Sequence, residues 1–253
     1  MNLFGARRRE LRRPARRVPS SAESDVAMRD GLEQNSDASN YICWIVDLCR
    51  PHLGQRILEI GAGKGDFSEH FSKHSHVYVT EISSRSKREL LTRFKDSERV
   101  QVAEVDLFSP QQSMKFDSVV MINVLEHIEQ DEEVLRGVQR LLNPGGSIVL
   151  YVPAHWLLYS RFDNQIGHFR RYTSREVEGI LTSAGFRQVS SRYVNSIGAI
   201  GWFVVCRVLR RKASEKSSVA LMDKVVIPVV RKVESRVRLP FGISVFATAR
   251  LPG

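Results

Sequence analysis

The sequence predicts an α/β fold in which a doubly wound, seven-stranded sheet is mostly parallel and ends in an antiparallel strand. From residue 56 onward, short apolar segments alternate with segments of helical periodicity, as in parallel strands joined by helices. The first apolar segment runs directly into a turn that contains three glycines, and an acid closes the next one. The last segment, residues 242–250, alternates apolar with smaller or polar side chains, as an antiparallel strand does.

Glycine, proline and capping residues mark the ends of the predicted elements. The first helix begins at Asp37, has apolar residues three and four apart, and ends before Pro51. The N-P-G-G sequence at 143–146 stops a later helix. Up to residue 152, the sequence predicts strands at 56–60, 77–81, 100–104, 116–122 and 147–152, and helices at 67–73, 85–94 and 131–142.

The C-terminal part of the domain is less regular. The sequence predicts a long loop over 153–172, followed by a helix over 173–184 that starts with a T-S-R-E capping box and ends at Gly185. A strand over 186–194 comes next. Residues 196–240 are predicted to form a helical insertion that roofs the substrate site before the last strand.

The segment L-E-I-G-A-G-K-G, residues 58–65, indicates a nucleoside-binding turn. Its glycines allow a sharp bend close to a ligand, and Glu81 can accept hydrogen bonds from both ribose hydroxyls. A dinucleotide-binding G-x-G-x-x-G turn would have its third glycine where this chain has Asp66, whose charge repels a pyrophosphate. S-adenosylmethionine carries a sulfonium and an α-ammonium group but no phosphate, so it suits acids such as Glu59 and Asp66. NAD is therefore disfavoured.

Four segments in register resemble the class I S-adenosylmethionine-dependent methyltransferases, in particular a bacterial group of them. These segments are L-E-I-G-A-G-K-G, Glu81, V-D-L at 105–107 and N-V-L-E-H at 123–127. The resemblance covers about residues 36–195 and the last strand. It implies that the protein binds S-adenosylmethionine in a crevice at the carboxyl ends of the strands.

The resemblance also implies a role for single residues. Gly61 and Gly63 face the methionine part of the cofactor, and Glu81 binds the ribose. Asp106 binds the adenine amino group, Leu107 packs on the adenine ring, and Asn123 with Val124 lines the methionine end. Tyr41, on the first helix, is a candidate partner for the cofactor carboxylate, with packing in the core as the alternative.

Methyl transfer depends mainly on alignment, and it needs a base only where the acceptor must lose a proton. The candidate catalytic groups are Glu126, His127 and His168, with His155 as a further histidine. Glu126 and His127 resemble part of the metal site of ubiquinone-pathway O-methyltransferases. Where those enzymes have another acid, this chain has Asn123, so no metal is expected. The alternative is that Glu126 and His127 only brace the next helix.

The segment G-H-F-R-R-Y-T, residues 167–173, resembles one found in bacterial methyltransferases near polysaccharide and glycolipid genes. Its adjacent arginines could clamp an anionic acceptor and form a lid over the crevice. A solvated basic loop is the alternative interpretation.

The net charge of +10 is concentrated in two appendages. Residues 7–17 carry +6 and residues 207–239 carry +7, which leaves −3 for the rest of the chain. Residues 1–35 are predicted to be a disordered basic arm, followed by the methyltransferase domain over 36–253. Because the domain core is not basic, no binding of nucleic acid is expected. Three cysteines without metal-ligand spacing favour a reducing compartment, the cytoplasm.

The second half of the insertion has valines at 225, 229, 233 and 237, next to basic residues. This pattern is typical of a helix that lies on a membrane surface, but it also fits a helix that packs on its own domain, which is the favoured alternative. Peripheral contact with an anionic membrane is thus one expected interaction. The longest apolar run of the insertion is too short to span a bilayer.

Taken together, these patterns predict a methyltransferase that uses S-adenosylmethionine and acts on an O or C atom of a small-molecule or lipid- or saccharide-linked acceptor. Two other functions remain open. One is a non-catalytic S-adenosylmethionine-binding adaptor that presents its basic insertion to membranes or partners. The other is an NAD-linked oxidoreductase, which Asp66 disfavours.

Overall fold

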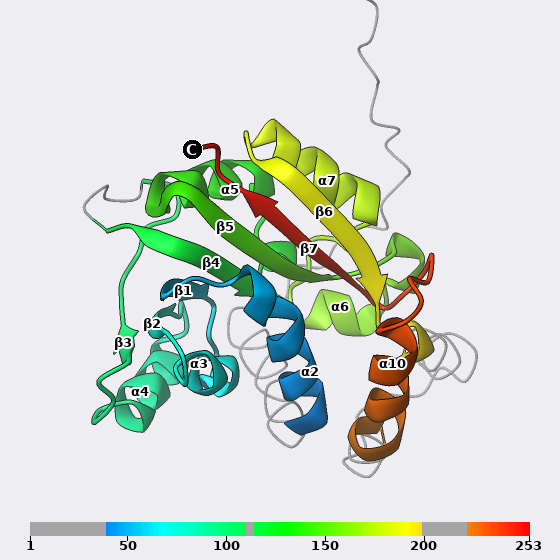
Figure 1. Cartoon of the computed structure of the whole chain (residues 1–253), viewed down its shortest axis with the longest axis horizontal. Helices are drawn as coiled ribbons and strands as arrows, with labels where there is room; N and C mark the ends of the chain where they lie inside the picture. Colours follow the sequence, from blue (N-terminus) through cyan, green and yellow to red (C-terminus); the bar gives the residue numbers. More distant parts are fainter. Residues whose placement is uncertain (1–38, 110–113, 199–221) are drawn as a thin grey trace, which may run out of the picture.

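The computed structural model describes residues 39–109, 114–198 and 222–253, and these residues form a seven-stranded sheet with helices on both faces (Figure 1). The strand order is β3-β2-β1-β4-β5-β7-β6, and β7 runs antiparallel to both β5 and β6. The predicted doubly wound fold with an antiparallel last strand is confirmed. The predicted arm over 1–35 and residues 199–221 of the insertion lie outside the described residues.

The elements follow the predicted alternation closely. The strands are β1 Arg56–Ile60, β2 His76–Thr80, β3 Val100–Val102, β4 Phe116–Ile122, β5 Leu142–Pro153, β6 Arg187–Val194 and β7 Ser244–Arg250. The helices are α2 Ser39–Cys49, α3 Asp66–Phe71, α4 Ser84–Arg93, α5 Asp131–Leu141, α6 Arg161–Gln165, α7 Ser174–Ser183 and α10 Ile227–Glu234. Shorter helical segments are η1 Arg50–His52, η2 Leu125–His127, η3 Trp156–Leu158 and a π-helical turn, η5 Met222–Val226.

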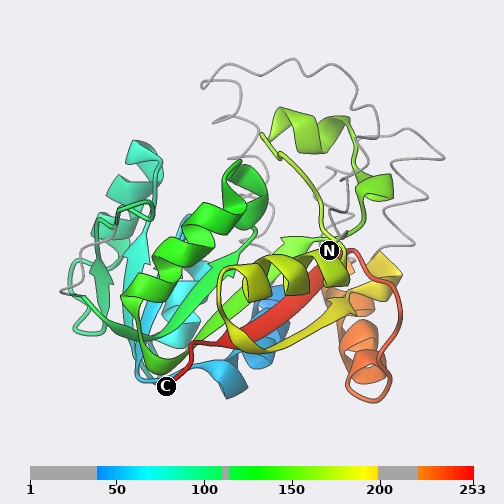
Figure 2. The same cartoon turned by 90° about the horizontal axis from the view of Figure 1, so that it is seen from above.

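Helices α5 and α7 lie on one face of the sheet, and α2 and α10 lie on the other (Figure 2). Alternating side chains of the central strands build two apolar cores, one on each face. Leu58 and Ile60 of β1 face the core that α5 and α7 cover. Ile57 faces the other core, which is covered by α2, α3 and α10. Because β1 pairs with both β2 and β4, the order of the strands reverses at this point. A ligand crevice is expected at the carboxyl ends of these strands.

The two largest differences from the predicted elements concern β5 and the loop that follows it. Strand β5 begins at Leu142, five residues early, because Leu142 pairs with Phe116 before a shift in register. The predicted loop over 153–172 contains η3 and α6. Helix α6 forms because the Asp163 carboxylate accepts hydrogen bonds from the backbone N–H and the hydroxyl of Ser160, at 2.8 and 2.9 Å.

Two buried acids attach the described part of the insertion to the domain. Asp223 accepts hydrogen bonds from the backbone N–H groups of Asn40 and Tyr41, at 3.1 and 2.8 Å, and so caps the N-terminus of α2. Glu234 accepts from the N–H groups of Asn195 and Ser196, at 3.2 and 2.9 Å. The segment packs on its own domain through Ile227 and Val230, which belong to the core under α2 and are not part of the predicted valine stripe.

The cap on α2 leads to a stability prediction. Replacing Asp223 with Ala should lower the free energy of unfolding by about 1–2 kcal/mol, because two helical N–H groups lose their acceptor. Urea denaturation followed by circular dichroism measures the change. Asp47→Ala is the control, because the partly exposed Asp47 pairs with exposed arginines and should contribute about half a kcal/mol or less. Equal stability of the Asp223→Ala variant and the wild type would contradict the capping role.

Among residues 39–109, 114–198 and 222–253, no helix is both long and apolar enough to cross a lipid bilayer. The sequence led to the same expectation.

Candidate active site

A cleft of about 980 Å³ opens at the carboxyl ends of β1, β2 and β4, where the strand order reverses. It is lined by seven of the predicted cofactor-binding residues and by all three of the residues predicted to be catalytic. These are Glu59, Gly61, Gly63, Glu81, Asp106, Leu107 and Asn123, together with Glu126, His127 and His168. Tyr41 and His155 are not among the lining residues. The fold thus brings most of the predicted residues to one cleft and leaves Tyr41 and His155 outside its lining.

The glycine turn has the conformation that its sequence requires. Gly61 and Gly63 have φ values of 71° and 57°, in the left-handed region that favours glycine. A Cβ atom on Gly61 would lie 2.6 Å from a methyl group of Val124, so the turn and the loop after β4 could not approach each other as they do. The turn therefore leaves backbone, and not side chain, at this wall of the cleft.

Glu81 is held across this turn. Its carboxylate accepts hydrogen bonds from the N–H of Gly63 and the N–H of Ser83, both at 2.9 Å. Each carboxylate oxygen can accept a further hydrogen bond, so a diol in the cleft can still bind. The next residue, Ile82, lines the cleft with its side chain 96 % exposed. Ile82 is not among the predicted site residues, although its place directly after Glu81 is a signal that the sequence contains.

Glu59 lies beneath the turn and is almost completely buried. Its carboxylate accepts a hydrogen bond from the hydroxyl of Ser68 at 2.6 Å. Burial raises the pKa of Glu59 to about 8, and the nearby acids Asp66 and Glu81 add to the effect. A cationic ligand in the cleft would favour the ionised form of this carboxyl group.

Tyr41 is placed differently from its predicted role. Its hydroxyl is 3.1 Å from the hydroxyl of Tyr151, and burial raises the pKa of Tyr41 to about 12. The ring packs against the core under α2. This position agrees with the core-packing alternative, and contact with the cofactor carboxylate stays an untested prediction.

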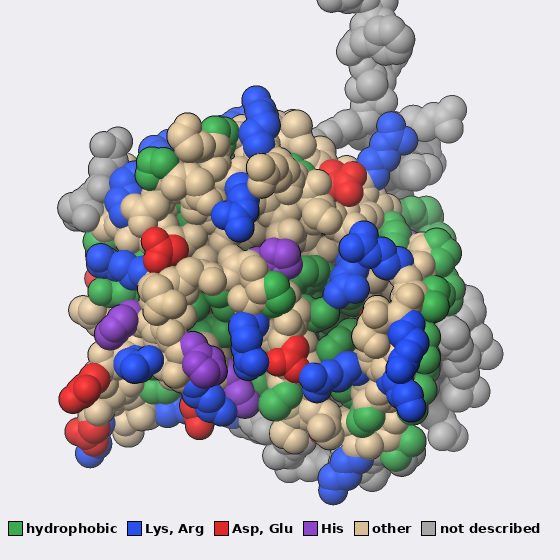
Figure 3. All heavy atoms as spheres, viewed as in Figure 1, with side chains coloured by type: hydrophobic (Ala, Val, Ile, Leu, Met, Phe, Trp, Pro, Cys, Tyr) green, Lys and Arg blue, Asp and Glu red, His purple; other side chains and the backbone are tan. Residues whose placement is uncertain are grey.

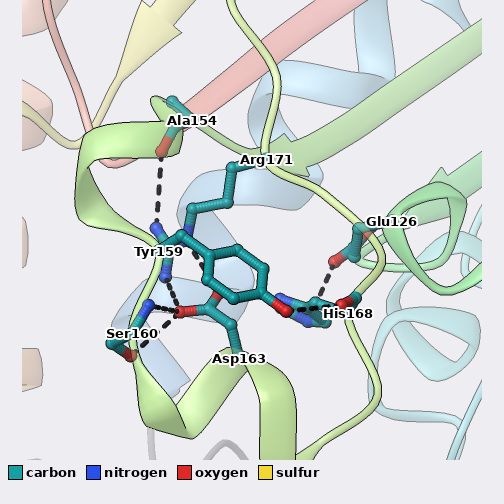
Figure 4. A network of polar contacts seen from close by, with 7 residues as sticks. All are labelled: Glu126, Ala154, Tyr159, Ser160, Asp163, His168 and Arg171. Carbon is teal, nitrogen blue, oxygen red and sulfur yellow. Dashed lines mark hydrogen bonds and ion pairs between the residues drawn. The ribbon is translucent and has the colours of Figure 1, made fainter. Parts of the chain in front are cut away.

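Glu126, His127 and His168 meet at one end of the cleft, although His168 comes from the loop after α6. Figure 4 shows Glu126 and His168 facing each other. His168 Nδ1 is 2.8 Å from Asp163 Oδ1, and His168 Nε2 is 3.7 Å from Glu126 Oε1. The rings of His127 and His168 lie edge to face with their centroids 4.6 Å apart. Among the described residues, neither carboxylate oxygen of Glu126 has a hydrogen-bond partner.

Burial separates the proton affinities of these groups. It raises the pKa of Glu126 to about 7 and lowers the pKa of His127 to about 3. Burial alone would also raise the pKa of Asp163, but the hydrogen bond from His168 and the charge of Arg171 lower it to about 2. Because Asp163 is ionised at neutral pH, His168 donates its Nδ1 proton to Asp163 and turns Nε2 toward Glu126. Of Glu126 and His127, only Glu126 has a pKa suited to a base at neutral pH.

The two arginines of G-H-F-R-R-Y-T do not form the expected clamp. Arg171 is buried and binds Asp163 through two nitrogens, at 2.7 and 3.1 Å (Figure 4). Arg170 binds Asp131 at 2.6 Å and the backbone carbonyl of Glu129 at 2.7 Å. Both guanidinium groups therefore fix the loop to the domain, and the prediction that they grip an anionic acceptor was wrong. Asp163, eight residues before Arg171, and Asp131, on another helix, are the acids that pair with them.

A family model described as a methyltransferase domain matches residues 15–191 of the chain. Ubiquinone biosynthesis O-methyltransferase of Albidiferax ferrireducens is 28% identical over 108 residues, which cover 41% of this chain and 42% of that protein. The Aeromonas salmonicida protein of the same name is 29% identical over 112 residues, or 42% of this chain and 47% of that protein. The matches thus span less than half the length of these curated relatives.

Solved structures share the fold at low sequence identity. Haemonchus contortus phosphoethanolamine N-methyltransferase 2, solved with S-adenosyl-L-methionine, has a TM-score of 0.54 and 20% identity, covering 79% of this chain and 49% of that one. Human N-acetylserotonin methyltransferase, also solved with S-adenosylmethionine, has a TM-score of 0.59 and 14% identity. The match covers 91% of this chain and 57% of that one.

Proposed function

The chain belongs to the methyltransferase domain family, within the class I S-adenosylmethionine-dependent methyltransferases, and on this premise we propose that it is an O-methyltransferase. Its acceptor would be a hydroxyl group of a small molecule or of a lipid- or saccharide-linked compound. One observation carries the proposal. A buried carboxyl group with a pKa near 7, Glu126, lies in the same cleft as the glycine turn and the ribose-binding acid. A hydroxyl acceptor needs such a base.

The geometry of the cleft suits S-adenosylmethionine at one end. Glu81 is held by two N–H groups and offers its remaining lone pairs to the ribose hydroxyls. The exposed side chain of Ile82 and the side chain of Leu107 offer an apolar surface for the adenine ring. The backbone of Gly61 and Gly63 admits the methionine part, with Glu59 below to favour positive charge.

At the other end, the acceptor oxygen would approach the sulfonium methyl group in line with the sulfur. The bond between sulfur and the methyl carbon breaks while the bond between oxygen and that carbon forms, and the hydroxyl proton moves to the Glu126 carboxylate. The products are a methyl ether and S-adenosylhomocysteine. His168, oriented by Asp163, faces Glu126 across 3.7 Å, a gap that one hydroxyl group or water can bridge. His168 would therefore position the acceptor and share its proton.

The same three residues also fit a divalent cation. One donor atom from each of Glu126, His127 and His168 lies within 4.8 Å of the others. The low pKa of His127 keeps its ring neutral, and His168 donates its other nitrogen to a carboxylate, as metal-binding histidines do. The expectation of no metal rested on Asn123, whereas His168 supplies a third donor. A bound cation would stabilise negative charge on the acceptor oxygen.

Replacing Glu81 with Ala should raise the dissociation constant for S-adenosylhomocysteine by about 10- to 100-fold, because the ribose loses hydrogen bonds to a charged acceptor. Isothermal titration calorimetry measures this change. Glu98→Ala, an exposed acid that does not line the cleft, is the control and should bind as the wild type does. Unchanged affinity in a folded Glu81→Ala variant would remove the proposed ribose contact.

The activity itself can be tested with methyl-labelled S-adenosylmethionine and separate aqueous and lipid fractions of cells. Transfer of label to an oxygen atom in either fraction is expected, with release of S-adenosylhomocysteine. Tight binding of S-adenosylhomocysteine without transfer to any fraction would instead favour the non-catalytic adaptor. Label recovered on carbon would contradict the proposed acceptor atom.

A further inference from the structure

The outer face of α10 and of the turn before it is apolar, although a helix attached to its domain should bury its apolar side. The four valines of this face, Val225, Val229, Val233 and Val237, are 54, 50, 39 and 50 % exposed. We call these residues the valine face. Their exposure contradicts the favoured expectation that these valines pack on the domain. Ile227 and Val230 take the buried positions instead.

The charged residues of this segment divide between a buried side and an exposed side. Both of its acids, Asp223 and Glu234, are buried and bind backbone N–H groups of the domain. Its basic residues are all exposed, and Arg231 pairs with Asp47 of α2. These are Lys224, Arg231, Lys232, Arg236 and Arg238. Figure 3 shows hydrophobic and basic side chains next to each other on the flank of the molecule over α10.

Helical geometry brings the two kinds of side chain onto one surface. Residues four apart in a helix differ by only about 40° in direction, so Val225, Val229 and Val233 form a stripe. Lys232 and Arg236 each follow a valine of the stripe by three residues, which places them beside it. The surface therefore offers exposed apolar side chains in the middle and cations at its edge.

We propose that the valine face and its basic residues bind the surface of an anionic lipid bilayer. Exposed cations next to a shallow apolar stripe complement anionic headgroups above the acyl chains. A protein partner would need acids placed opposite each cation, whereas a lipid surface supplies negative charge at every position. The inference goes beyond the proposed methyl transfer and does not depend on it.

Flotation of the full chain with vesicles tests this inference. Wild-type protein should float with vesicles of phosphatidylcholine and phosphatidylglycerol but not with phosphatidylcholine alone. Replacing Lys232 and Arg236 together with Ala should lower the partition coefficient by about 30-fold. Replacing Val229 and Val233 together with Gln, which leaves the charge unchanged, should lower it by about tenfold. Added salt should weaken wild-type binding.

Matched controls lie on α4 and just after it. Leu91→Gln removes a half-exposed apolar side chain, and the double variant Arg88→Ala, Lys95→Ala removes two exposed cations. Both should float as the wild type does. The basic residues at 7–17 are present in every sample, so differences between variants report on the valine face alone. Wild-type protein that does not float, or variants of the face that float unchanged, would overturn the proposal.

Binding of S-adenosylhomocysteine, measured on the same samples, separates this proposal from the proposed function. The face variants should keep wild-type affinity, because no residue of the face lines the cleft. Loss of flotation with intact ligand binding supports the bilayer surface. Flotation without ligand binding in the wild type would contradict the methyltransferase proposal alone.

Discussion

Replacing Glu126 with Gln is expected to lower kcat by about 10²- to 10⁴-fold while leaving the affinity for S-adenosylhomocysteine close to that of the wild type. The amide cannot take the acceptor proton, but it has nearly the same shape as the carboxyl group. The side chain is completely buried and its carboxylate has no hydrogen-bond partner among the described residues, so the change removes no hydrogen bond and affects only the 3.7 Å contact with His168. Transfer of labelled methyl groups measures kcat, and calorimetry measures binding.

The pH profile distinguishes a base from a merely structural residue. Burial raises the pKa of Glu126 to about 7, so the ionised form required for catalysis is lost as the pH falls through this value. Wild-type kcat should then decrease about tenfold per pH unit below 7. The residual rate of the Glu126→Gln variant should not show this dependence. Glu129→Gln, an exposed acid three residues later, should keep the wild-type profile, and a shared profile in all three proteins would eliminate Glu126 as the base.

Replacing Asp163 with Ala should lower the free energy of unfolding by about 3–5 kcal/mol at neutral pH, because it leaves the buried guanidinium of Arg171 without its partner. The variant also loses the acceptor for His168 and the cap of α6. The pKa of Asp163 is lowered to about 2, below its value in the unfolded chain. Its stabilisation is therefore complete above about pH 4 and is lost as the pH falls toward 2.

Two further proteins identify the cause of this effect. Glu69→Ala breaks an exposed ion pair with Arg93 and should cost about 1 kcal/mol or less. The double variant Asp163→Leu, Arg171→Met has no unpaired buried charge, so it should recover part of the stability that Asp163→Ala loses. Urea denaturation at neutral pH measures all four proteins. If Asp163→Ala is no less stable than Glu69→Ala, the network does not hold the loop.

Much of the end of the cleft that contains the glycine turn could be predicted from local sequence patterns. The φ values of Gly61 and Gly63 are a property of the glycine turn itself. The position of Glu81, directly after β2, follows from the alternation of strands and helices. Parallel strands align their carboxyl ends, so the residues that follow β1, β2 and β4 lie close together. Their proximity can therefore be predicted from the strand pattern alone. Ile82 belongs to the same local pattern, although the prediction did not include it.

The end of the cleft that contains Glu126 could be predicted only in part. Glu126, His127 and His168 were named, but neither the pairing of His168 with Asp163 nor the burial that raises the pKa of Glu126 is visible in residue spacing. The prediction that Arg171 contacts an anionic acceptor was wrong. Its partner is Asp163, which lies on α6, a helix within the segment that was predicted to be a loop. The charge of an arginine can be read from sequence, but the acid that neutralises it cannot.

The sequence by itself determined the α/β alternation, the glycine turn after β1 and the position of the acid after β2, since each depends on backbone preferences within a few residues or on strand periodicity. Only the tertiary structure decided which buried acids meet His168 and Arg171, and which side of the α10 segment is covered. Burial and ion pairing between distant segments depend on how whole elements pack, and valines spaced four apart show a stripe without showing what it faces.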